Sequence, residues 1–327
     1  MKISTYRTRV CFAAVFLALL QFTASAEALD YPIRPVKIIT QGAAGSGPDV
    51  IARLVAEELG RLWRQQVLIV NHPGGGGIIA ARAAAAAEPD GHTIYIPTIT
   101  SFVIMPEVQA KLPFDMVRDF TQIGFVAETP MMIGVSPALG VNSLQEFIEF
   151  AKQRPKELFY AANNRGSLPH LTGELFLRRT GADVTFVPYA GAAAGLQDLI
   201  GGRIAMIVES IGALSGAVHG GSVKPLAVAS ALRLPHLPDL PTVAESIPGF
   251  EAMGWFVLSG PAKMAAGTVE KVNQDLSKVL AQPTLKQKFL DLGAYTRPMS
   301  PDETSGFIRK EEQVWRPLVR ELGLNTP

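Results

Sequence analysis

The residues best suited to binding chemistry lie in one small loop near the start of the chain. Residues 38–40 form an apolar, β-branched run typical of a strand, and a loop of glycine, alanine and serine follows it at 42–47. Asp49 stands where the N-cap of the next helix is expected. A helix N-terminus flanked by small residues offers free backbone N–H groups and partial positive charge, so this loop predicts a binding place for an anion.

The same loop lacks the residues that two common phosphate-binding motifs require. No Lys-Ser or Lys-Thr pair follows the glycines, as a P-loop would need. Val50 stands where a dinucleotide fingerprint has its third glycine. We therefore expect no nucleotide cofactor at this turn.

Catalytic and metal-binding patterns are poorly supported elsewhere. The histidines never occur at the His-x-x-x-His spacing, and the only cysteine, Cys11, lies near the N-terminus. No Gly-x-Ser-x-Gly elbow is present, since the run Gly212 to Gly216 misses that spacing by one residue. We expect neither an enzyme nor a bound metal or cofactor. The five histidines are His72, His92, His170, His219 and His236.

The N-terminal segment has the pattern of a secretory signal. Basic residues precede an apolar run at 10–20, which is shorter than the roughly 20 residues that span a bilayer. Ala24-Ser25-Ala26 then supplies a small-x-small cleavage site. We expect cleavage after Ala26 and export to the periplasm, with a retained membrane anchor as the less favoured alternative. Cys11 would leave with the signal, so the mature chain would hold no disulfide.

Composition is that of a globular protein without a charged binding face. The 327 residues carry a net charge of +1, which gives no basic stripe for nucleic acid and no acidic tail. A chain of this length can bury a sizeable core and favours two lobes.

Expected strands and helices alternate along the chain. This alternation predicts an α/β protein with mainly parallel sheets, in which ligands bind outside the carboxyl ends of the strands. The loops that follow the strands ending near residues 40, 71, 97 and 161 would then face one crevice. The strands are expected at 36–40, 67–71, 93–97, 123–126, 131–135, 159–161, 184–187, 204–208, 226–229 and 254–258, and the main helices at 50–62, 78–87, 171–179, 268–280, 283–292 and 301–322.

Several conspicuous residues are expected to be structural. The four glycines Gly74–Gly77 suit a packed or hinge-side turn better than direct ligand contact, and His170 is expected to bond locally at the start of a helix. The tryptophans Trp63, Trp255 and Trp315 are expected to pack in the core.

A series of short motifs in a fixed order points to a known family. The chain resembles the periplasmic solute-binding receptors of the tripartite tricarboxylate transporter family, also called Bug receptors, from about Tyr31 to Leu322. Single motifs are weak, but their order and spacing together are specific. They are Tyr31-Pro32-x-x-Pro35-Val36, Gly45-Ser46-Gly47-Pro48-Asp49, Asn71-His72-Pro73-Gly74, Pro89-Asp90-Gly91-His92-Thr93, Lys111-Leu112-Pro113-Phe114-Asp115, Gly173-Glu174-Leu175-Phe176, Val187-Pro188-Tyr189-x-Gly191 and Leu240-Pro241-Thr242-Val243-Ala244-Glu245.

The resemblance implies a type II periplasmic-binding-protein fold, in which two α/β lobes joined by two crossing strands close on a ligand in the cleft between them. The crossings are expected near 125–132 and 254–258. After a signal at 1–26, the first lobe would combine 27–129 with 255–327, and the second would hold 130–254.

The resemblance also implies the contacts, carried over position by position. In this family, main-chain N–H groups, hydroxyls and waters typically hold a ligand carboxylate, and such charge-assisted bonds need no ion pair. The first lobe would contribute Gly45, Ser46, Gly47, Asp49, Thr100, Ser101 and Phe102, and the second Arg165, Gly166, Ser167, Tyr189, Gly191, Ala192 and Glu209.

Two of these positions, and Pro48 beside them, depart from the family pattern or leave alternatives open. Pro48 replaces a threonine and removes a hydroxyl and an N–H. Arg165 lies in a stretch where the family is Ser/Gly-rich, and we hypothesise that it pairs with a second acidic group on the ligand. Glu209 stands where the family usually has aspartate; a ligand amine, a lobe-closing hydrogen bond and a structural pair remain open for it.

The function implied is that of a monomeric receptor. It would capture a small carboxylate-bearing ligand and deliver it to the small and large membrane subunits of a tripartite carrier. An alternative is a ligand-sensing adaptor that signals to a membrane sensor kinase without transport. A periplasmic hydrolase is a third and weaker alternative.

Overall fold

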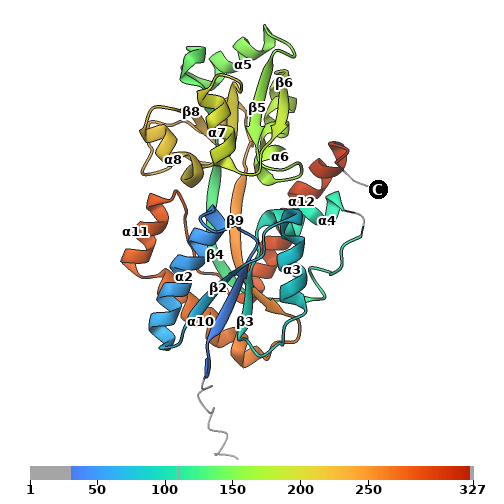
Figure 1. Cartoon of the computed structure of the whole chain (residues 1–327), viewed down its shortest axis with the longest axis vertical. Coiled ribbons are helices and arrows are strands. Elements are labelled where there is room, and N and C mark those ends of the chain that lie inside the picture. The colour runs from blue at the N-terminus through green and yellow to red at the C-terminus, as the bar shows by residue number, and fades with distance from the viewer. Residues whose placement is uncertain (1–30, 110, 325–327) are drawn as a thin grey trace, which may run out of the picture.

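The computed structural model describes residues 31–109 and 111–324, which form two α/β lobes linked by two strands (Figure 1). The linking strands are β4 (Phe120–Val135) and β9 (Met253–Pro261). The expected signal segment and its cleavage site after Ala26 lie outside the described residues.

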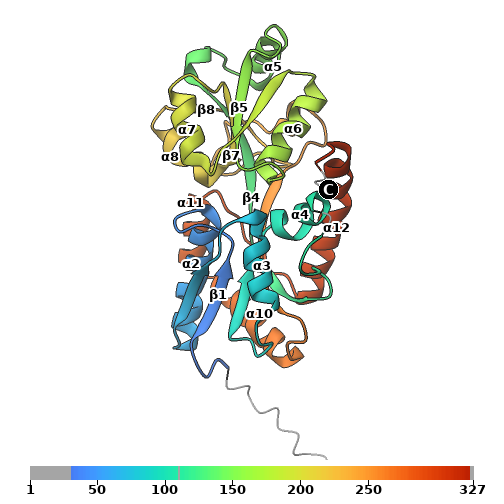
Figure 2. The same ribbon diagram turned by 45° about the vertical axis from the view of Figure 1, so that its right-hand side comes forward.

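The first lobe carries the N-terminal strands and the C-terminal helices, and the second lobe carries the middle of the chain (Figures 1 and 2). The first lobe contains β1 (Val36–Thr40), α2 (Gly47–Trp63), β2 (Val67–Asn71), α3 (Ile78–Ala85), β3 (Thr93–Ile96), a π-helical turn (Thr100–Ile104), α4 (Met105–Val108), α10 (Ala266–Leu280), α11 (Pro283–Asp291) and α12 (Pro301–Glu321). The second contains α5 (Leu144–Lys152), β5 (Leu158–Ala162), α6 (Leu168–Thr180), β6 (Val184–Pro188), α7 (Ala192–Ile200), β7 (Met206–Ser210), α8 (Ile211–His219), β8 (Lys224–Val228) and α9 (Val243–Ser246).

The strands form one continuous sheet in the order β2-β1-β3-β9-β4-β7-β5-β6, with β8 paired to β4. The pairs of β1 with β2 and β3, and of β5 with β6 and β7, are parallel as expected. The pairs that β4 and β9 make are all antiparallel. The expectation of mainly parallel sheets is therefore wrong for the centre, because strands that cross between the lobes run in opposite directions.

A single strand occupies the stretch where two were expected. From Phe120 to Pro130, β4 pairs with β9, and from Met131 to Val135 it pairs with β7 and β8. Pro130 has no N–H to donate, so its place where β4 changes partners costs no ladder hydrogen bond. The strand continues through Pro130 because a new partner begins at the next residue.

Most helix ends follow the capping signals. Ser300 and Glu303 form the expected capping box of α12, with Pro301 in its first turn. Gly181, at a φ of 70°, ends α6 as expected. The start of α2 differs, because Ser46 is its N-cap and Asp49 lies inside the first turn. A negative charge in the first turn interacts favourably with the positive end of the helix dipole, so Asp49 can stabilise the start of α2 without being its N-cap.

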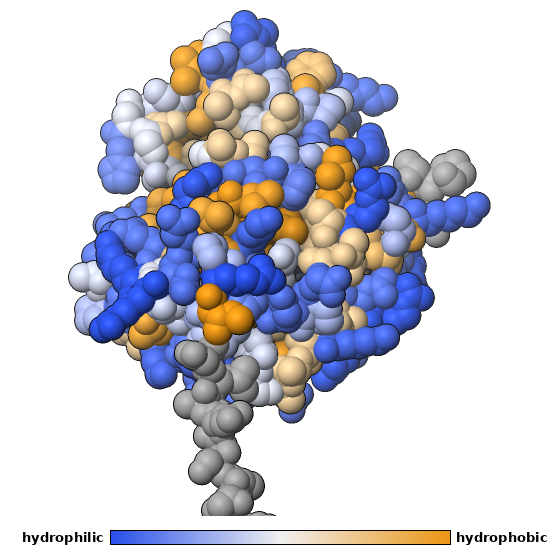
Figure 3. Space-filling model, turned by 60° about the horizontal axis from the view of Figure 1, so that its bottom comes forward, coloured by the Kyte–Doolittle hydropathy of each residue, from blue (hydrophilic) through white to orange (hydrophobic). Residues whose placement is uncertain are grey.

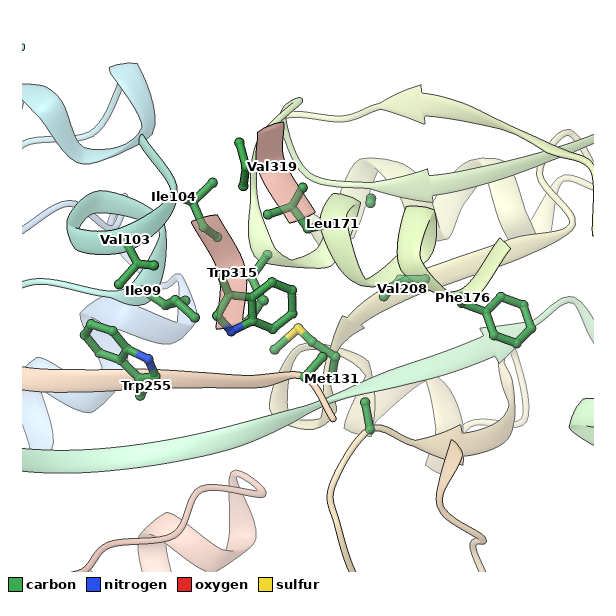
Figure 4. Packing of buried hydrophobic residues seen from close by; sticks show 14 of the residues in the cluster. Ile99, Val103, Ile104, Met131, Leu171, Phe176, Val208, Trp255, Trp315 and Val319 are labelled. Carbon is green, nitrogen blue, oxygen red and sulfur yellow. The ribbon is translucent and has the colours of Figure 1, made fainter. Parts of the chain in front are cut away.

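The core continues from the first lobe across the junction into the second. Figure 4 shows Trp315 beside Met131 at the crossing of β4 and β9, Trp255 farther along β9 beside Ile99, and Leu171 and Val208 on the second-lobe side. Trp255 is fully buried, and its indole Nε1 donates to Glu311 at 3.0 Å. Trp63 and Trp315 are also buried, so the prediction that the tryptophans pack in the core is confirmed.

The surface shown in Figure 3 is mixed, with apolar groups in patches between charged side chains. Across residues 31–109 and 111–324, no helix has both the length and the apolar character that crossing a bilayer requires.

We predict that Gly173→Ala destabilises the second lobe. An added Cβ would lie 2.4 Å from the buried ring of Tyr160, and overpacking of this kind costs about 1–3 kcal/mol in the free energy of unfolding. Gly306→Ala on α12 is the matched control, since its nearest neighbour is the Arg309 guanidinium at 3.8 Å. Alanine there should stabilise by up to about 1 kcal/mol through helix propensity. Urea denaturation checks both, and equal effects would contradict the prediction.

Candidate functional site

Loops from both lobes meet at the junction between them. The loops after β1 and β3 in the first lobe, and after β5, β6 and β7 in the second, each lead directly into a helix or helical turn. An added Cβ on Gly166 would lie 3.2 Å from Val108 of α4, so the loop after β5 lies against the first lobe (Figure 2). The start of α8 also touches the first lobe, because a Cβ on Gly212 would lie 2.5 Å from the carbonyl oxygen of Leu292.

Asp49 holds the first loop in shape. Its carboxylate is 1% exposed and accepts hydrogen bonds from the Gly45 amide at 2.8 Å, the Asn71 side chain at 2.7 Å and Arg53 Nε at 2.9 Å. Burial alone would raise the pKa of Asp49, but these hydrogen bonds outweigh it and lower the pKa. The carboxylate is thus an organiser of the loop, with its oxygens already occupied by this chain.

The tip of this loop leaves small groups accessible. Gly45 and Gly47 are exposed, and Ser46 is half-buried. Ser46 caps α2 with its backbone only, and its hydroxyl oxygen is buried without a hydrogen-bond partner among the described residues. The first amides of α2 have no intrahelical acceptor, so the turn presents donors as expected of a helix N-terminus.

The loop after β3 is held from inside the first lobe. The Ser101 hydroxyl accepts from the Thr98 amide at 3.1 Å and lies 3.3 Å from the Tyr95 hydroxyl. Phe102 is fully buried, with its ring centroid 5.2 Å from that of Phe120. Of the three residues predicted in this loop, only Thr100 is partly exposed.

The four-glycine turn packs against the same loop. All four glycines have positive φ, from 58° to 111°. A Cβ on Gly76 would lie 2.5 Å from the sulfur of Met105, and one on Gly77 would lie 2.7 Å from the Cβ of Ser101. This close approach agrees with the expected packing role and leaves Gly74–Gly77 as support for the loop after β3.

In the second lobe, His170 orders the loop that carries Arg165, Gly166 and Ser167. The Gly166 amide donates to His170 Nδ1 at 3.1 Å, and the Ser167 hydroxyl accepts from the His170 amide at 3.4 Å. Burial, with Arg165 nearby, lowers the pKa of His170 to about 4, so the ring is neutral at pH 7. The Gly166 amide is therefore already used, while Arg165 is exposed.

In the loop after β6, the side chain of Tyr189 is already hydrogen-bonded within the chain, whereas backbone amides at the start of α7 are not. The Tyr189 hydroxyl donates to Asp198 at 2.6 Å, and the Tyr189 amide donates to the Ala162 carbonyl at 3.0 Å. Gly191 is the N-cap of α7 and Ala192 is its first residue; both are half-buried. The first amides of α7 are donors without intrahelical acceptors.

Glu209 is a buried carboxyl at the end of β7. It is 6% exposed and accepts from the Ser210 amide at 2.9 Å and from the side chain of Asn163. Burial raises the pKa of Glu209 to about 7, even though the bonds from Ser210 and Asn163 oppose the rise. Of the roles left open for Glu209, the local hydrogen bond to Asn163 is present.

Sequence reasoning did not assign a role to several residues that shape this region. Asn71 and Asn163 each stand at or just after the end of a strand, the place where parallel sheets bind ligands. Their position at a strand end was the sequence feature that could have marked both asparagines as site residues. The partnership of His170 with the Gly166 amide needed the folded loop, because the two residues meet only through the turn before α6.

A separate cavity of about 560 Å³ lies in the first lobe, away from the second-lobe loops. It is lined by residues of the segment before and within β4, of α10 and of α12. Phe102, which belongs to the loop after β3, lines this cavity. The other predicted site residues do not line the cavity.

We predict that acid weakens the fold through His170. The folded pKa of about 4 lies below the ordinary 6.5, so the neutral ring stabilises the protein fully above pH 6.5 and loses this effect as the pH falls toward 4. The loss amounts to roughly 3 kcal/mol by linkage. In urea denaturation at pH 7 and pH 4.5, His170→Gln should be less stable at pH 7 and lose less on acidification. The exposed His219→Gln serves as the control, and a wild-type-like loss in His170→Gln would refute the assignment.

Comparisons with known proteins agree on one family. The family model for the tripartite tricarboxylate transporter family receptor, TctC, matches residues 51–324. Protein BugT of Bordetella pertussis is 32% identical over 315 residues, which cover 94% of this chain and 95% of that protein.

Solved structures show the same two-lobe fold. R. palustris Rpa4515 with adipate has a TM-score of 0.85 and 33% identity, and covers 90% of this chain and 98% of its own. MatC from Rhodopseudomonas palustris with bound malate has a TM-score of 0.80 and 29% identity, with coverage of 88% and 100%. The expected periplasmic-binding-protein fold is confirmed. This chain therefore belongs to the tripartite tricarboxylate transporter receptor family of periplasmic solute-binding proteins.

Proposed function

We propose that this protein captures a small carboxylate-bearing ligand between its lobes and delivers it to the membrane subunits of a tripartite tricarboxylate-type carrier. One observation carries the proposal: the helices α2, α6 and α7, from both lobes, begin at small residues on loops that meet at the junction. Helix N-termini attract anions through their free amides and dipoles.

The predicted contacts divide into two roles in this proposal. Gly45, Ser46, Gly47, Thr100, Arg165, Gly191, Ala192 and Glu209 are the candidates for contact with ligand or with bridging water. Asp49, Ser101, Phe102, Gly166, Ser167 and Tyr189 position those groups, since each is buried or already bonded within the chain. Several convergent amides can hold a carboxylate without an ion pair.

Arg165 is the candidate anchor for a second acidic group. Its side chain is exposed, and no carboxylate of the described residues forms an ion pair with it. It lies close enough to the start of α6 to lower the pKa of His170. The relatives with adipate and with malate hold dicarboxylates, and this chain carries a free guanidinium beside its proposed pocket.

We propose that the two lobes move as units when the protein closes. The first lobe is made of residues 27–129 and 255–327, and the second of residues 130–254. The linking strands β4 and β9 would act as the hinge, as in other two-lobe receptors. Contacts on either side already join the lobes: Arg178 pairs with Glu321 at 3.1 Å, and the Tyr295 hydroxyl lies 2.9 Å from His236 Nδ1. We propose that the monomer closes in this way on its ligand.

The first prediction tests carboxylate capture directly. Residues 27–327 are screened by thermal shift and calorimetry against succinate, adipate, malate, aspartate, glutamate and benzoate, with their amides as controls. An acid at 100 times its dissociation constant should add about 2.7 kcal/mol to the free energy of unfolding. Binding of amides and acids alike, or of no acid, would refute the proposal.

The second prediction tests Arg165. We expect Arg165→Ala to weaken dicarboxylate binding about fivefold, because an exposed ion pair contributes about 1 kcal/mol. Binding of a monocarboxylate should change less. Arg82→Ala, at an exposed arginine on α3, is the matched control. Unchanged affinity for every dicarboxylate would remove Arg165 from the site.

The third prediction concerns export. We expect the protein recovered from the periplasm to begin at Glu27, as read by intact-mass measurement. Replacing the small residue at the cleavage site, Ala26→Leu, should leave a longer precursor in the membrane fraction. A periplasmic protein that still starts at Met1 would contradict the proposed signal.

A further inference from the structure

Two polar side chains at neighbouring strand ends form a pair that the proposed carboxylate site does not explain. Asn163 follows β5 directly and Glu209 lies in β7, and these two strands are parallel neighbours (Figure 2). The side-chain amide of Asn163 donates to one oxygen of Glu209, and the Ser210 amide donates to the other at 2.9 Å.

This bonding fixes which atom of Asn163 faces away from the carboxylate. The ionised carboxylate only accepts hydrogen bonds, so in that form of Glu209 the NH₂ group of Asn163 is the end that faces it, as the structure has it. The other end of the amide, Oδ1, is then left over. It is buried and has no hydrogen-bond partner among the described residues. Buried polar atoms are normally satisfied, so this carbonyl oxygen is available to a donor that the described residues do not supply, a water or a group of the ligand.

Within residues 31–109 and 111–324, no positively charged side chain pairs with the carboxyl of Glu209. The bonds that act on it come from Asn163 and Ser210 alone. Titratable groups on the elements packed around β7 have other partners. On α6, His170 accepts from the Gly166 amide, Glu174 accepts from the Tyr160 hydroxyl of β5, Arg178 pairs with Glu321 and Arg179 donates to the Pro248 carbonyl. Asp198 on α7 bonds Tyr189 and Arg203, His219 on α8 lies 2.7 Å from the Ser215 carbonyl oxygen, and Glu128 on β4 pairs with Arg297. On β4, an apolar residue, Met132, stands opposite Glu209. Arg165 influences His170 and Tyr160, with no resolved effect on Glu209.

We propose that Asn163 Oδ1 and Glu209 form an acceptor site for a hydrogen-bond donor on the ligand, either a hydroxyl or an ammonium group. The protein would then prefer hydroxy- or amino-substituted dicarboxylates over unsubstituted ones of the same length. The inference rests on the proposed function, since it assigns a ligand class to the same pocket. A matched donor on the ligand satisfies a buried acceptor, whereas an unsubstituted acid leaves it unpaired.

The ionisation of Glu209 gives this selection a pH dependence. Burial raises the pKa of Glu209 to about 7, so the acceptor form is a minority at pH 6 and dominates at pH 8. A donor-bearing ligand binds the ionised form, and its apparent affinity scales with the fraction of protein in that form. Affinity should therefore rise about tenfold from pH 6 to pH 8.

The test uses three acids that differ in one substituent. Calorimetry at pH 8 compares succinate, which has no donor, with malate and aspartate, which carry a hydroxyl and an ammonium group. Glutarate, 2-hydroxyglutarate and glutamate repeat the comparison one carbon longer. We expect the hydroxy or amino acid to bind at least tenfold more tightly than its unsubstituted parent. Which of the two binds better identifies the donor.

Two variants test whether the preference for substituted acids comes from Glu209 and Asn163. Glu209→Gln and Asn163→Ser should each reduce the preference to less than threefold, and Glu209→Gln should also flatten the dependence on pH. Glu174→Gln is the matched control: it alters another glutamate of the second lobe, bonded to Tyr160 at 2.7 Å, and should keep the preference. Circular dichroism verifies that each variant is folded, and the comparison of acids on the unaltered protein stands without them.

The outcomes separate this inference from the function on which it rests. If unsubstituted and substituted acids bind equally well, the acceptor site is wrong while the carboxylate receptor stands. A preference that survives in both Glu209→Gln and Asn163→Ser would also overturn the assignment. If no acid of either length binds, and none in the wider screen does, the proposed receptor function fails instead.

Discussion

The antiparallel pairing of β4 with β9 is the contact on which the arrangement of the lobes depends. These are the two strands that run between the lobes, and they are paired from Phe120 with Pro261 to Pro130 with Met253. Beyond Pro130 the same β4 strand enters the sheet of the second lobe. Because one strand belongs to both sheets, the carboxyl ends of β1 and β3 are held facing those of β5, β6 and β7. A small change in twist along this ladder would move one whole lobe relative to the other.

The site is shaped mainly by side chains that do not face the ligand in our proposal. Asp49 fixes the loop before α2, Ser101 and Phe102 fix the loop after β3, and His170 fixes the loop before α6. Each is nearly or fully buried, so its interaction is screened little by water. In our proposal, the groups left to bind a ligand are the backbone amides at the N-termini of α2, α6 and α7. Backbone donors held in this way are preorganised and do not pay to be ordered on binding.

Glu209 and Asn163 depart from this pattern of internal satisfaction, as the buried hydroxyl of Ser46 also does. Among the described residues, the buried carboxyl has no cation and the buried carbonyl has no donor, and both arrangements cost free energy. Groups of that kind are usually retained where a partner arrives from outside the chain. Adipate, held by one relative, offers no hydroxyl or amino group, whereas malate, held by another, does. These relatives thus include both ligand classes, and our proposal assigns this chain to the second.

The sequence by itself determined the local structure. The β-branched runs and the capping signals at Ser300 and Gly181 located the elements, and the ordered motifs indicated the family and its two-lobe fold. These signals are short-range, because propensity and capping depend on residues a few positions apart. Within that range the sequence misplaced the cap of α2, which is Ser46 and not Asp49. Only the tertiary structure decided that β4 is one strand with antiparallel partners. It also decided that Asn163 meets Glu209, 46 residues away. Such contacts depend on which strands become neighbours, and no local pattern in the chain specifies that.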